Sequence, residues 1–300
     1  MRRLTAIVLG AAAGGGFPQW NCRCPVCRLA WDSDPRVVSR TQASLAVSGD
    51  GERWTLINAT PDLRGQIRAT PALRPRTLRD SPIASVVLTG AEIDQIAGLL
   101  DLRERQPFAL YATEQVHATL RDNPIFNALA PDFVTRRDIV LGESIALAGG
   151  LEAELFTVPG KVPLYLEDKT DILTGDEEEN CGLEVRAGAQ RLVYIPGAAA
   201  VTPEMETRMA RADVLLFDGT LFTDDEMIRA GVGPKTGRRM GHMPIGGDEG
   251  SLRLLSRLSA RRIYTHINNT NPILVAGSPE RRTVESAGCE VAEDGLRIAL

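Results

Sequence analysis

Three of the five cysteines in this 300-residue chain lie within six positions. Cys22, Cys24 and Cys27 stand in the stretch GGGFPQWNCRCPVCRLAW, where glycines and a proline allow the backbone to fold tightly. Three thiolates on one short loop could hold Zn²⁺, which takes four ligands in structural sites and would therefore need a fourth from elsewhere. A structural zinc site is the interpretation that we prefer. A redox CxxC pair and inert packing are the alternatives.

Histidines are scarce, since the chain has only three. His117 lies in the helical pattern EQVHATL, which we expect on the surface without a special role. His242 stands in RRMGHMPIGG, a loop before a helix, where a functional and a structural role are both open. His266 ends the strand-like run RIYTH. Because α/β folds place their sites at the carboxyl ends of strands, His266 is predicted to be functional.

Two segments place carboxylates directly after apolar runs. In VVLTGAEIDQIAGLL the run ends at Thr89, and Glu92 and Asp94 follow at the start of a helical pattern. In DVLLFDGT, Asp218 follows four apolar residues. Carboxylates at such places could bind a metal or a ligand, or they could be ordinary helix caps and turn residues.

The predicted strands and helices that must position these residues do not alternate regularly along the chain. The strand-like runs are residues 5–10, 44–48, 53–59, 83–89, 108–113, 138–142, 152–158, 183–187, 191–196, 214–219, 262–267 and 296–300. The helical patterns are residues 62–70, 92–105, 114–129, 202–212 and 250–260. Within 92–105, one helix face is expected to carry Ile93, Ile96, Ala97 and Leu100. Because strands come in pairs and triplets before helices, we expect a mixed-sheet α/β protein or a sheet sandwich flanked by helices. Nothing separates two domains, so residues 1–300 are expected to form one.

Composition narrows the class of protein. The net charge of −5, with 43% hydrophobic and 24% charged residues, is typical of a soluble globular protein and offers no basic face for nucleic acid. The start, MRRLTAIVLGAAAGGG, has the outline of a signal peptide, but its short apolar run favours a first strand. No run approaches the ~20 apolar residues of a membrane span. We therefore expect a cytoplasmic protein with no membrane partner, in which clustered cysteines are more often metal ligands or catalysts than disulfides.

Several segments resemble the metallo-β-lactamase superfamily. SVVLTGAEIDQIAGLL is similar to its central motif, T-H-x-H-x-D-H-x-x-G-L, with Asp94 retained. Three histidines of that motif are replaced here by Gly90, Glu92 and Gln95. LLFDGT places Asp218 where the bridging aspartate of the superfamily lies, and GHMPIGG…RIYTHINNTNP resembles the G-H-L-S…T-H ending.

A narrower resemblance runs nearly end to end. GAAAGGGFPQWNCRC, RTQASLAV, NATPDLR and HINNTNP resemble signatures of the pyrroloquinoline quinone (PQQ) biosynthesis B family. This resemblance implies an αββα sandwich of two mixed sheets, and a structural zinc at Cys22, Cys24 and Cys27. It also implies iron-dependent oxygenation of the tyrosine ring of a cross-linked Glu–Tyr precursor. The alternative role is a carrier that helps export PQQ or a late intermediate.

The residues support part of these implications. A dinuclear zinc hydrolase of the phosphodiesterase type needs a histidine-rich site, which three histidines cannot supply. A mononuclear site of imidazoles and carboxylates remains open, and such ligands suit Fe²⁺ and O₂ chemistry. Gln95 is a weak, neutral ligand, and it keeps the carrier role open. The candidate catalytic residues are Glu92, Asp94, Gln95, Asp218, His242 and His266. His242 could also act as acid or base for a phenol proton.

Two questions stay open. His266 could complete a Cys₃His zinc site or serve the reactive metal. In the second case the fourth zinc ligand would be Asn269, Asn271 or water. An acidic, dipeptide-like, tyrosine-derived substrate or PQQ would also need cationic contacts. Candidates for these contacts are Arg64, Lys161, Arg238 and Arg239. The apolar face of residues 110–120 could be core or the interface of a homodimer.

Overall fold

The computed structural model describes residues 3–161 and 178–300. The first sheet contains β1 (Thr5–Gly10), β2 (Ser44–Ser48), β3 (Trp54–Ile57), β4 (Ile83–Val87), β5 (Phe108–Ala112), β6 (Val134–Asp138) and β14 (Arg297–Ala299). The second contains β7 (Ser144–Leu147), β8 (Leu151–Thr157), β9 (Cys181–Ala187), β10 (Gln190–Ile195), β11 (Val214–Asp218), β12 (Arg261–Thr265) and β13 (Cys289–Val291).

Both sheets are mixed. The first has the order β14-β1-β2-β3-β4-β5-β6, and the second has the order β13-β12-β11-β10-β9-β8-β7. Pairing is antiparallel from β14 to β3 and parallel from β3 to β6. In the second sheet it is antiparallel from β7 to β10 and parallel from β10 to β13.

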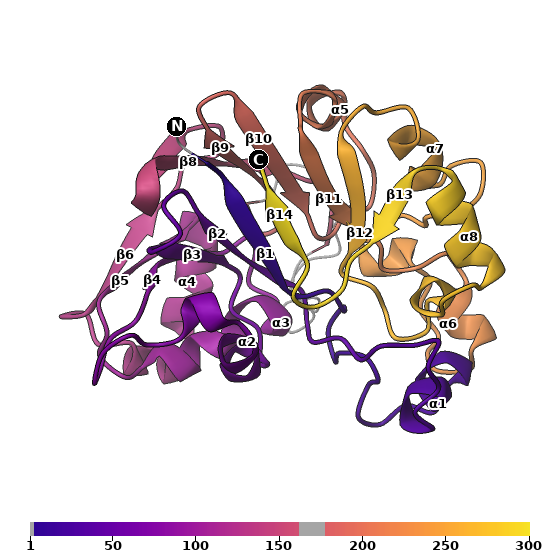
Figure 1. Cartoon of the computed structure of the whole chain (residues 1–300), viewed down its shortest axis with the longest axis horizontal. Helices are drawn as coiled ribbons and strands as arrows, with labels where there is room; N and C mark the ends of the chain where they lie inside the picture. The colour runs from indigo at the N-terminus through magenta and orange to yellow at the C-terminus, as the bar shows by residue number, and fades with distance from the viewer. Residues whose placement is uncertain (1–2, 162–177) are drawn as a thin grey trace.

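Helices cover the outer sides of the two sheets (Figure 1). The α-helices are α1 (Pro25–Trp31), α2 (Leu63–Ala69), α3 (Ile93–Ile96), α4 (Glu114–Asp122), α5 (Pro203–Ala210), α6 (Glu226–Arg229), α7 (Ser251–Leu255) and α8 (Pro279–Ser286). The 3₁₀ helices are η1 (Pro71–Leu73), η2 (Ala97–Leu102), η3 (Pro124–Ala128), η4 (Ala148–Gly150), η6 (Arg238–Met240) and η7 (Pro272–Leu274). The longer helices begin where the sequence supplies a cap, as at Thr113, Thr202 and Ser278, whose hydroxyls each accept a backbone N–H of the first turn. This arrangement is the metallo-β-lactamase fold, and it confirms the predicted αββα sandwich.

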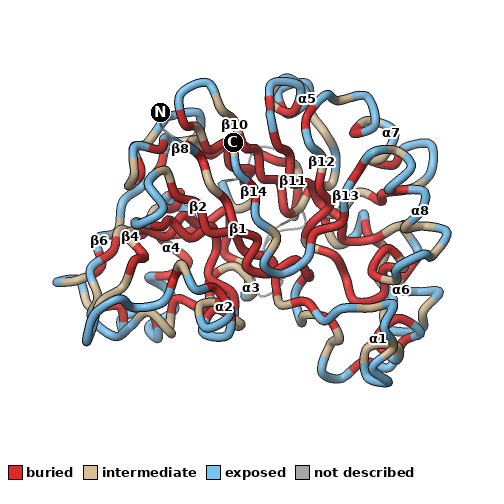
Figure 2. Tube along the Cα trace, viewed as in Figure 1, coloured by how far each residue is buried: buried red, intermediate tan, exposed pale blue. Residues whose placement is uncertain are grey.

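The hydrophobic core has three layers, and the central strands lie between them. The middle layer packs the facing sides of the two sheets, with Leu45, Leu183 and Tyr194 among its buried residues. One outer layer packs the first sheet against α2 and α4, and the other packs the second sheet against α1, α5, α7 and α8. Central strands are therefore buried on both faces, and Figure 2 shows them as continuous buried segments.

Three sequence predictions are wrong in detail. Residues 138–142 do not form a strand, because β6 ends at Asp138 and β7 begins at Ser144. The predicted apolar face of 92–105 holds only in part: Ile96 is 5% exposed but Ile93 is 57% exposed, and the α-helical geometry ends at Ile96, where 3₁₀ geometry follows. His117 is buried, at 1% exposure, and not on the surface; its Nε2 lies 3.2 Å from the carbonyl oxygen of Arg137.

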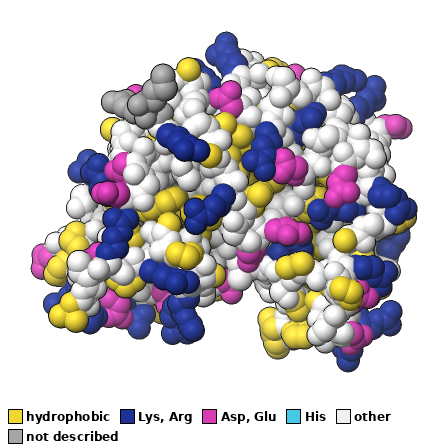
Figure 3. All heavy atoms as spheres, in the orientation of Figure 1, with side chains coloured by type: hydrophobic (Ala, Val, Ile, Leu, Met, Phe, Trp, Pro, Cys, Tyr) yellow, Lys and Arg dark blue, Asp and Glu magenta, His cyan; other side chains and the backbone are white. Residues whose placement is uncertain are grey.

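The surface shows no concentration of one charge on the face drawn in Figure 3, where cationic and acidic side chains are interspersed. Within residues 3–161 and 178–300, no helix has the length and apolar character needed to cross a bilayer.

Candidate functional site

The site forms where two neighbouring parallel strands end. Asp218 is the last residue of β11, and it pairs in register with Thr265, the last residue of β12. His266 follows directly, with a left-handed φ of 54°. This conformation is uncommon for a non-glycine residue and is held only where the surroundings impose it. The two strand ends therefore bring a carboxylate and an imidazole to one edge of the sheet.

Asp218 is the centre of the site, and its carboxylate is fully buried. Oδ2 lies 2.7 Å from Nδ1 of His242 and accepts the backbone N–H of Ala198 at 2.9 Å. Oδ1 accepts the hydroxyl of Thr220 at 2.6 Å and its backbone N–H at 3.0 Å. The carboxylate thus holds His242, which arrives on the loop after η6, in a defined orientation.

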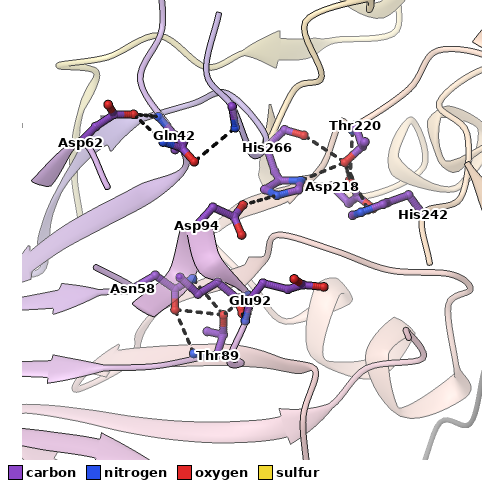
Figure 4. A network of polar contacts seen from close by, with 12 residues as sticks. Gln42, Asn58, Asp62, Thr89, Glu92, Asp94, Asp218, Thr220, His242 and His266 are labelled. Carbon is purple, nitrogen blue, oxygen red and sulfur yellow. Dashed lines mark hydrogen bonds and ion pairs between the residues drawn. The ribbon is translucent and has the colours of Figure 1, made fainter. Parts of the chain in front are cut away.

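The hydroxyl of Thr220 lies between both imidazoles and Asp218 (Figure 4). It is 3.1 Å from Nδ1 of His242 and 2.9 Å from Nδ1 of His266. The two rings stack with centroids 5.3 Å apart. No sequence motif singled out Thr220, although it stands two residues after Asp218 in DGT.

Asp94 joins the cluster from the first turn of α3. Its Oδ2 lies 3.2 Å from Nε2 of His266, on the other side of the ring from Thr220. Asp94, His242 and His266 are each partly exposed, at 16–17% of the side chain, and all three face one cavity of about 390 Å³. That volume is within the range of small-molecule sites.

Charge in the cluster is set by these contacts. Burial raises the pKa of Asp218, but the charge of His242 and its hydrogen bond outweigh burial, so the pKa lies below its ordinary value. Burial also raises the pKa of Asp94, and the bond and charge of His266 again bring it below the ordinary value. Burial lowers the pKa of His266, but the bond to Asp94 raises it above the ordinary value. Both carboxylates are therefore ionised at neutral pH.

Glu92 and Gln95 line the same cavity, but Gln95 is occupied with local structure. Its Oε1 accepts the backbone N–H of Glu92 at 3.0 Å, and its Nε2 donates to Thr89 at 3.3 Å. A Cβ on Gly90 would lie 2.5 Å from Oε1 of Gln95. The Cβ would also lie 2.6 Å from the backbone carbonyl oxygen of Glu179, so this backbone excludes any side chain at position 90.

The donor set fits a divalent metal. Asp218, His242 and His266 each offer a ligand atom, and these atoms lie within 4.8 Å of one another. Two imidazoles and a carboxylate beside an open cavity are the type of set that binds non-haem Fe(II) or Zn²⁺.

The three cysteines form a second group with ligand atoms within 4.8 Å of one another. All three thiols are buried, and α1 begins there because Cys24 accepts the N–H of Cys27 and Pro25 occupies the first helical position. The hydrogen bond between Cys24 and Cys27 raises the pKa of the Cys24 thiol and lowers that of Cys27. Three sulfurs on one buried loop fit the ligand preference of zinc.

The loop after β12 serves both groups. His266 belongs with Asp218 and His242, and the thiol group does not include it. Asn269 approaches the thiols instead, with Nδ2 at 3.2 Å from the sulfurs of both Cys22 and Cys27. The other proposed ligand, Asn271, donates to the carbonyl oxygen of Gly219 at 2.9 Å. The same short loop therefore fixes His266 at one site and Asn269 at the other.

The glycine-rich loop beside the cavity is held by the residues of the RTQ and PDLR segments. Gln42 donates to Asp62 from both its backbone and its side chain, each at 2.9 Å, and its Oε1 accepts the N–H of Gly15 at 3.2 Å (Figure 4). Arg40 is 3% exposed and donates to the carbonyl oxygen of Ala292 at 2.9 Å. These motifs therefore position the loop.

Of the four cationic residues that were predicted to contact an acidic ligand, one lines the cavity. Lys161 lines the cavity, whereas Arg64, Arg238 and Arg239 do not. Sequence reasoning did not single out six other lining residues. Gln19, Met240 and Asn268 lie inside the quoted motifs, and Asn180, Met227 and Lys235 lie outside them.

A buried acid near the cavity gives the protein a pH-dependent stability. Glu226 accepts the hydroxyl of Thr270 at 2.6 Å and the N–H of Phe222 at 2.7 Å, and burial raises its pKa to about 7. The folded state keeps this proton between pH 4.5 and 7 while the unfolded state releases it. The contribution is therefore complete below pH 4.5 and is lost as the pH rises to about 7, about 3 kcal/mol in total.

We expect Glu226→Gln to remove this loss. In urea unfolding at pH 5 and pH 8, the variant should gain stability relative to the parent protein as the pH rises. An unchanged difference between the two proteins at both pH values would contradict the assignment.

Comparison with known proteins agrees with this architecture. Residues 53–267 match the family model described as a beta-lactamase superfamily domain. The coenzyme PQQ synthesis protein B of Methylobacterium sp. (strain 4-46) is 54% identical over 299 residues, which cover 99% of this chain and 100% of that protein. The protein of the same name from Methylorubrum extorquens (strain AM1) is 53% identical over 296 residues, covering 98% and 99%.

A solved structure shows the same fold over the full length. The crystal structure of Zn²⁺-bound PqqB from Methylobacterium extorquens superposes with a TM-score of 0.96 at 53% identity, covering 99% of this chain and 100% of that chain. The chain therefore belongs to the coenzyme PQQ synthesis protein B family, within the beta-lactamase superfamily.

Proposed function

We propose that this protein is an iron-dependent hydroxylase that acts on the tyrosine ring of a cross-linked Glu–Tyr precursor of PQQ. The observation that carries the proposal is the group formed by Asp218, His242 and His266, whose two imidazoles line a cavity of about 390 Å³. Membership of the PQQ synthesis family supports a substrate from the synthesis of PQQ, and the mixed donor set is compatible with Fe(II).

Different residues would bind the metal, orient its ligands and contact the substrate. Asp218, His242 and His266 would hold the Fe(II), which when bound supplies the activation of O₂. Asp94 contacts Nε2 of His266 and Thr220 contacts Nδ1, so one of these contacts would orient the ring while the nitrogen of the other would bind the metal. Met227 and Met240 give the cavity adaptable apolar surface for an aromatic ring.

The reaction balances with an external reductant. An aromatic C–H bond is replaced by C–OH with one atom of O₂, and the other atom leaves as water. Two electrons and two protons are consumed in each hydroxylation, and we assign their supply to a small two-electron reductant such as ascorbate.

We assign zinc to the cysteine group. Cys22, Cys24 and Cys27 would hold Zn²⁺, with Asn269 beside them, and the metal would keep the loop after β12 in place. We place the protein in the cytoplasm, where a reducing environment keeps the three thiols available for the metal.

The test separates the two metals before it measures turnover. The protein is purified anaerobically, reconstituted with Fe(II), and analysed for zinc and iron, beside the variant Cys22→Ser/Cys24→Ser. We expect the variant to lose one zinc and to keep one iron. Addition of ¹⁸O₂, ascorbate and a Glu–Tyr cross-linked amino acid should then give a product containing ¹⁸O.

The alternative is a carrier that binds PQQ or a late intermediate without chemistry. The observation in its favour is the loss of the motif histidines: Gly90 supplies no ligand, and Gln95 is hydrogen-bonded to the backbone of Glu92. Zinc bound only at the cysteines, with no iron under any loading and no labelled product, would reject the hydroxylase and favour the carrier.

A further inference from the structure

The chain uses lysine very rarely. Of its 34 cationic residues, 31 are arginines and only three are lysines, at positions 161, 169 and 235. Lys169 lies outside the described residues. The other two, Lys161 and Lys235, both line the cavity that contains His242, His266 and Asp94. No arginine lines that cavity among the described residues. The cationic residues of the cavity are thus of a different type from those of the rest of the chain.

Lys161 is placed by close packing against the loop that carries His242. Gly241 ends η6 with a left-handed φ of 83°, and a Cβ at this position would lie 3.1 Å from both Cγ and the backbone nitrogen of Lys161. Only a glycine allows both this turn and this approach without strain. His242 is the next residue, so Lys161 and the metal-binding imidazole lie on adjoining parts of the cavity wall.

Lys235 belongs to the same loop, on the other side of η6. The N–H of His242 donates to the carbonyl oxygen of Gly237 at 2.9 Å, and Gly237 in turn donates to the carbonyl oxygen of Asp224 at 2.8 Å. This loop is therefore closed on itself, and it carries Lys235, Met240 and His242 together to the cavity.

The cavity lining consequently carries groups of both charges. Glu92 and Asp94 supply carboxylates, and Lys161 and Lys235 supply ammonium groups beside the imidazoles. A lysine ammonium is a compact charge with three donors that binds carboxylates as a point charge, without the planar geometry that a guanidinium requires. The amide side chains of Gln19, Asn180 and Asn268 add neutral polar groups to the lining.

We infer that Lys161 and Lys235 bind carboxylates of the ligand and so make it preferred over an uncharged analogue with the same ring system. The identity of the ligand rests on the proposed function. The role of the two lysines rests on their place in the cavity lining and is tested by binding alone, without turnover.

The test measures binding without iron or O₂. Equilibrium dialysis compares two probes, PQQ with its three carboxylates and its trimethyl ester, which has the same ring system without these charges. The parent protein should bind PQQ at least about 10-fold more tightly than the ester. Lys161→Gln and Lys235→Gln should each weaken PQQ binding about 10-fold, the loss typical of one charged contact, and leave ester binding unchanged.

Two controls make the result specific. Arg239→Gln removes one positive charge from an exposed residue of the same loop, outside the cavity lining, and should leave PQQ binding within about 2-fold. Lys161→Arg and Lys235→Arg restore the charge and should recover part of the affinity. The inference is overturned if the parent protein does not prefer PQQ to the ester, if it binds neither probe, or if both glutamine variants bind PQQ as the parent does. Iron binding and labelled product, measured separately, decide the hydroxylase proposal.

Discussion

Asp218→Asn is expected to remove iron binding and to lower hydroxylation at least about 100-fold. The carboxylate is fully buried and accepts hydrogen bonds from Ala198 and Thr220 while holding His242 at 2.7 Å. An asparagine keeps the shape of the side chain but loses its charge. Its NH₂ group would also face N–H or O–H groups that donate to the carboxylate, so one hydrogen bond would be replaced by a contact between two donors. Loss of one ligand together with the orientation of a second exceeds the 10- to 100-fold cost typical of a supporting contact.

The measurement is iron content after anaerobic reconstitution, followed by turnover. Asp62→Asn is the matched control, because Asp62 is also a carboxylate bound to donors near the cavity, yet it contacts Gln42 and neither imidazole. This control should keep its iron. Full iron occupancy in Asp218→Asn would show that the metal is held elsewhere and would reject the assignment of this cluster.

Removal of zinc is expected to destabilise the protein strongly. A ligand present at 1,000 times its Kd stabilises the folded state by about 4 kcal/mol. For a chain of this size, the loss corresponds to a fall in Tm on the order of 10 °C. Calorimetry with and without a zinc chelator, and on Cys24→Ser, checks this expectation.

Cys289→Ser is the control for the loss of a buried thiol. Cys289 is 3% exposed and lies in β13, outside the cysteine group. Its substitution should cost stability to a similar degree with and without chelator, whereas Cys24→Ser should make the protein insensitive to chelator. If the chelator lowers the Tm of Cys24→Ser as much as that of the parent protein, the cysteines are not the zinc site.

The two sites should also communicate, because one loop connects them. His266 and Asn269 are three residues apart, and they contact the Asp218 cluster and the thiols respectively. Zinc removal should therefore lower the affinity for iron as well as stability, although the site still takes up one iron when Fe(II) is supplied in excess. This connection gives the cysteine group a positioning role for the reactive site without placing zinc in the chemistry.

Much of the fold could be predicted from sequence because the central strands are buried on both faces. The predicted runs 5–10 and 44–48 coincide with β1 and β2. The sequence pattern did not predict the edge strands β6 and β13. β6 has the sequence VTRRD and β13 is only three residues long, so neither has the apolar pattern of a buried strand. Both lie at sheet edges, where pairing with a neighbour rather than burial defines the strand.

The sequence by itself determined the family motifs, the zinc-type cysteine spacing and the candidates Asp94, Asp218, His242 and His266. Residue type and local order are sufficient for these, because each motif lies within one short segment. Only the tertiary structure decided that His266 faces Asp218 while Asn269 faces the thiols, and that Thr220 stands between the two imidazoles. Only the structure brought Lys161 and Lys235 to one cavity. These relations join residues far apart in the chain, and they exist because parallel strands end at a common edge and long loops fold over it.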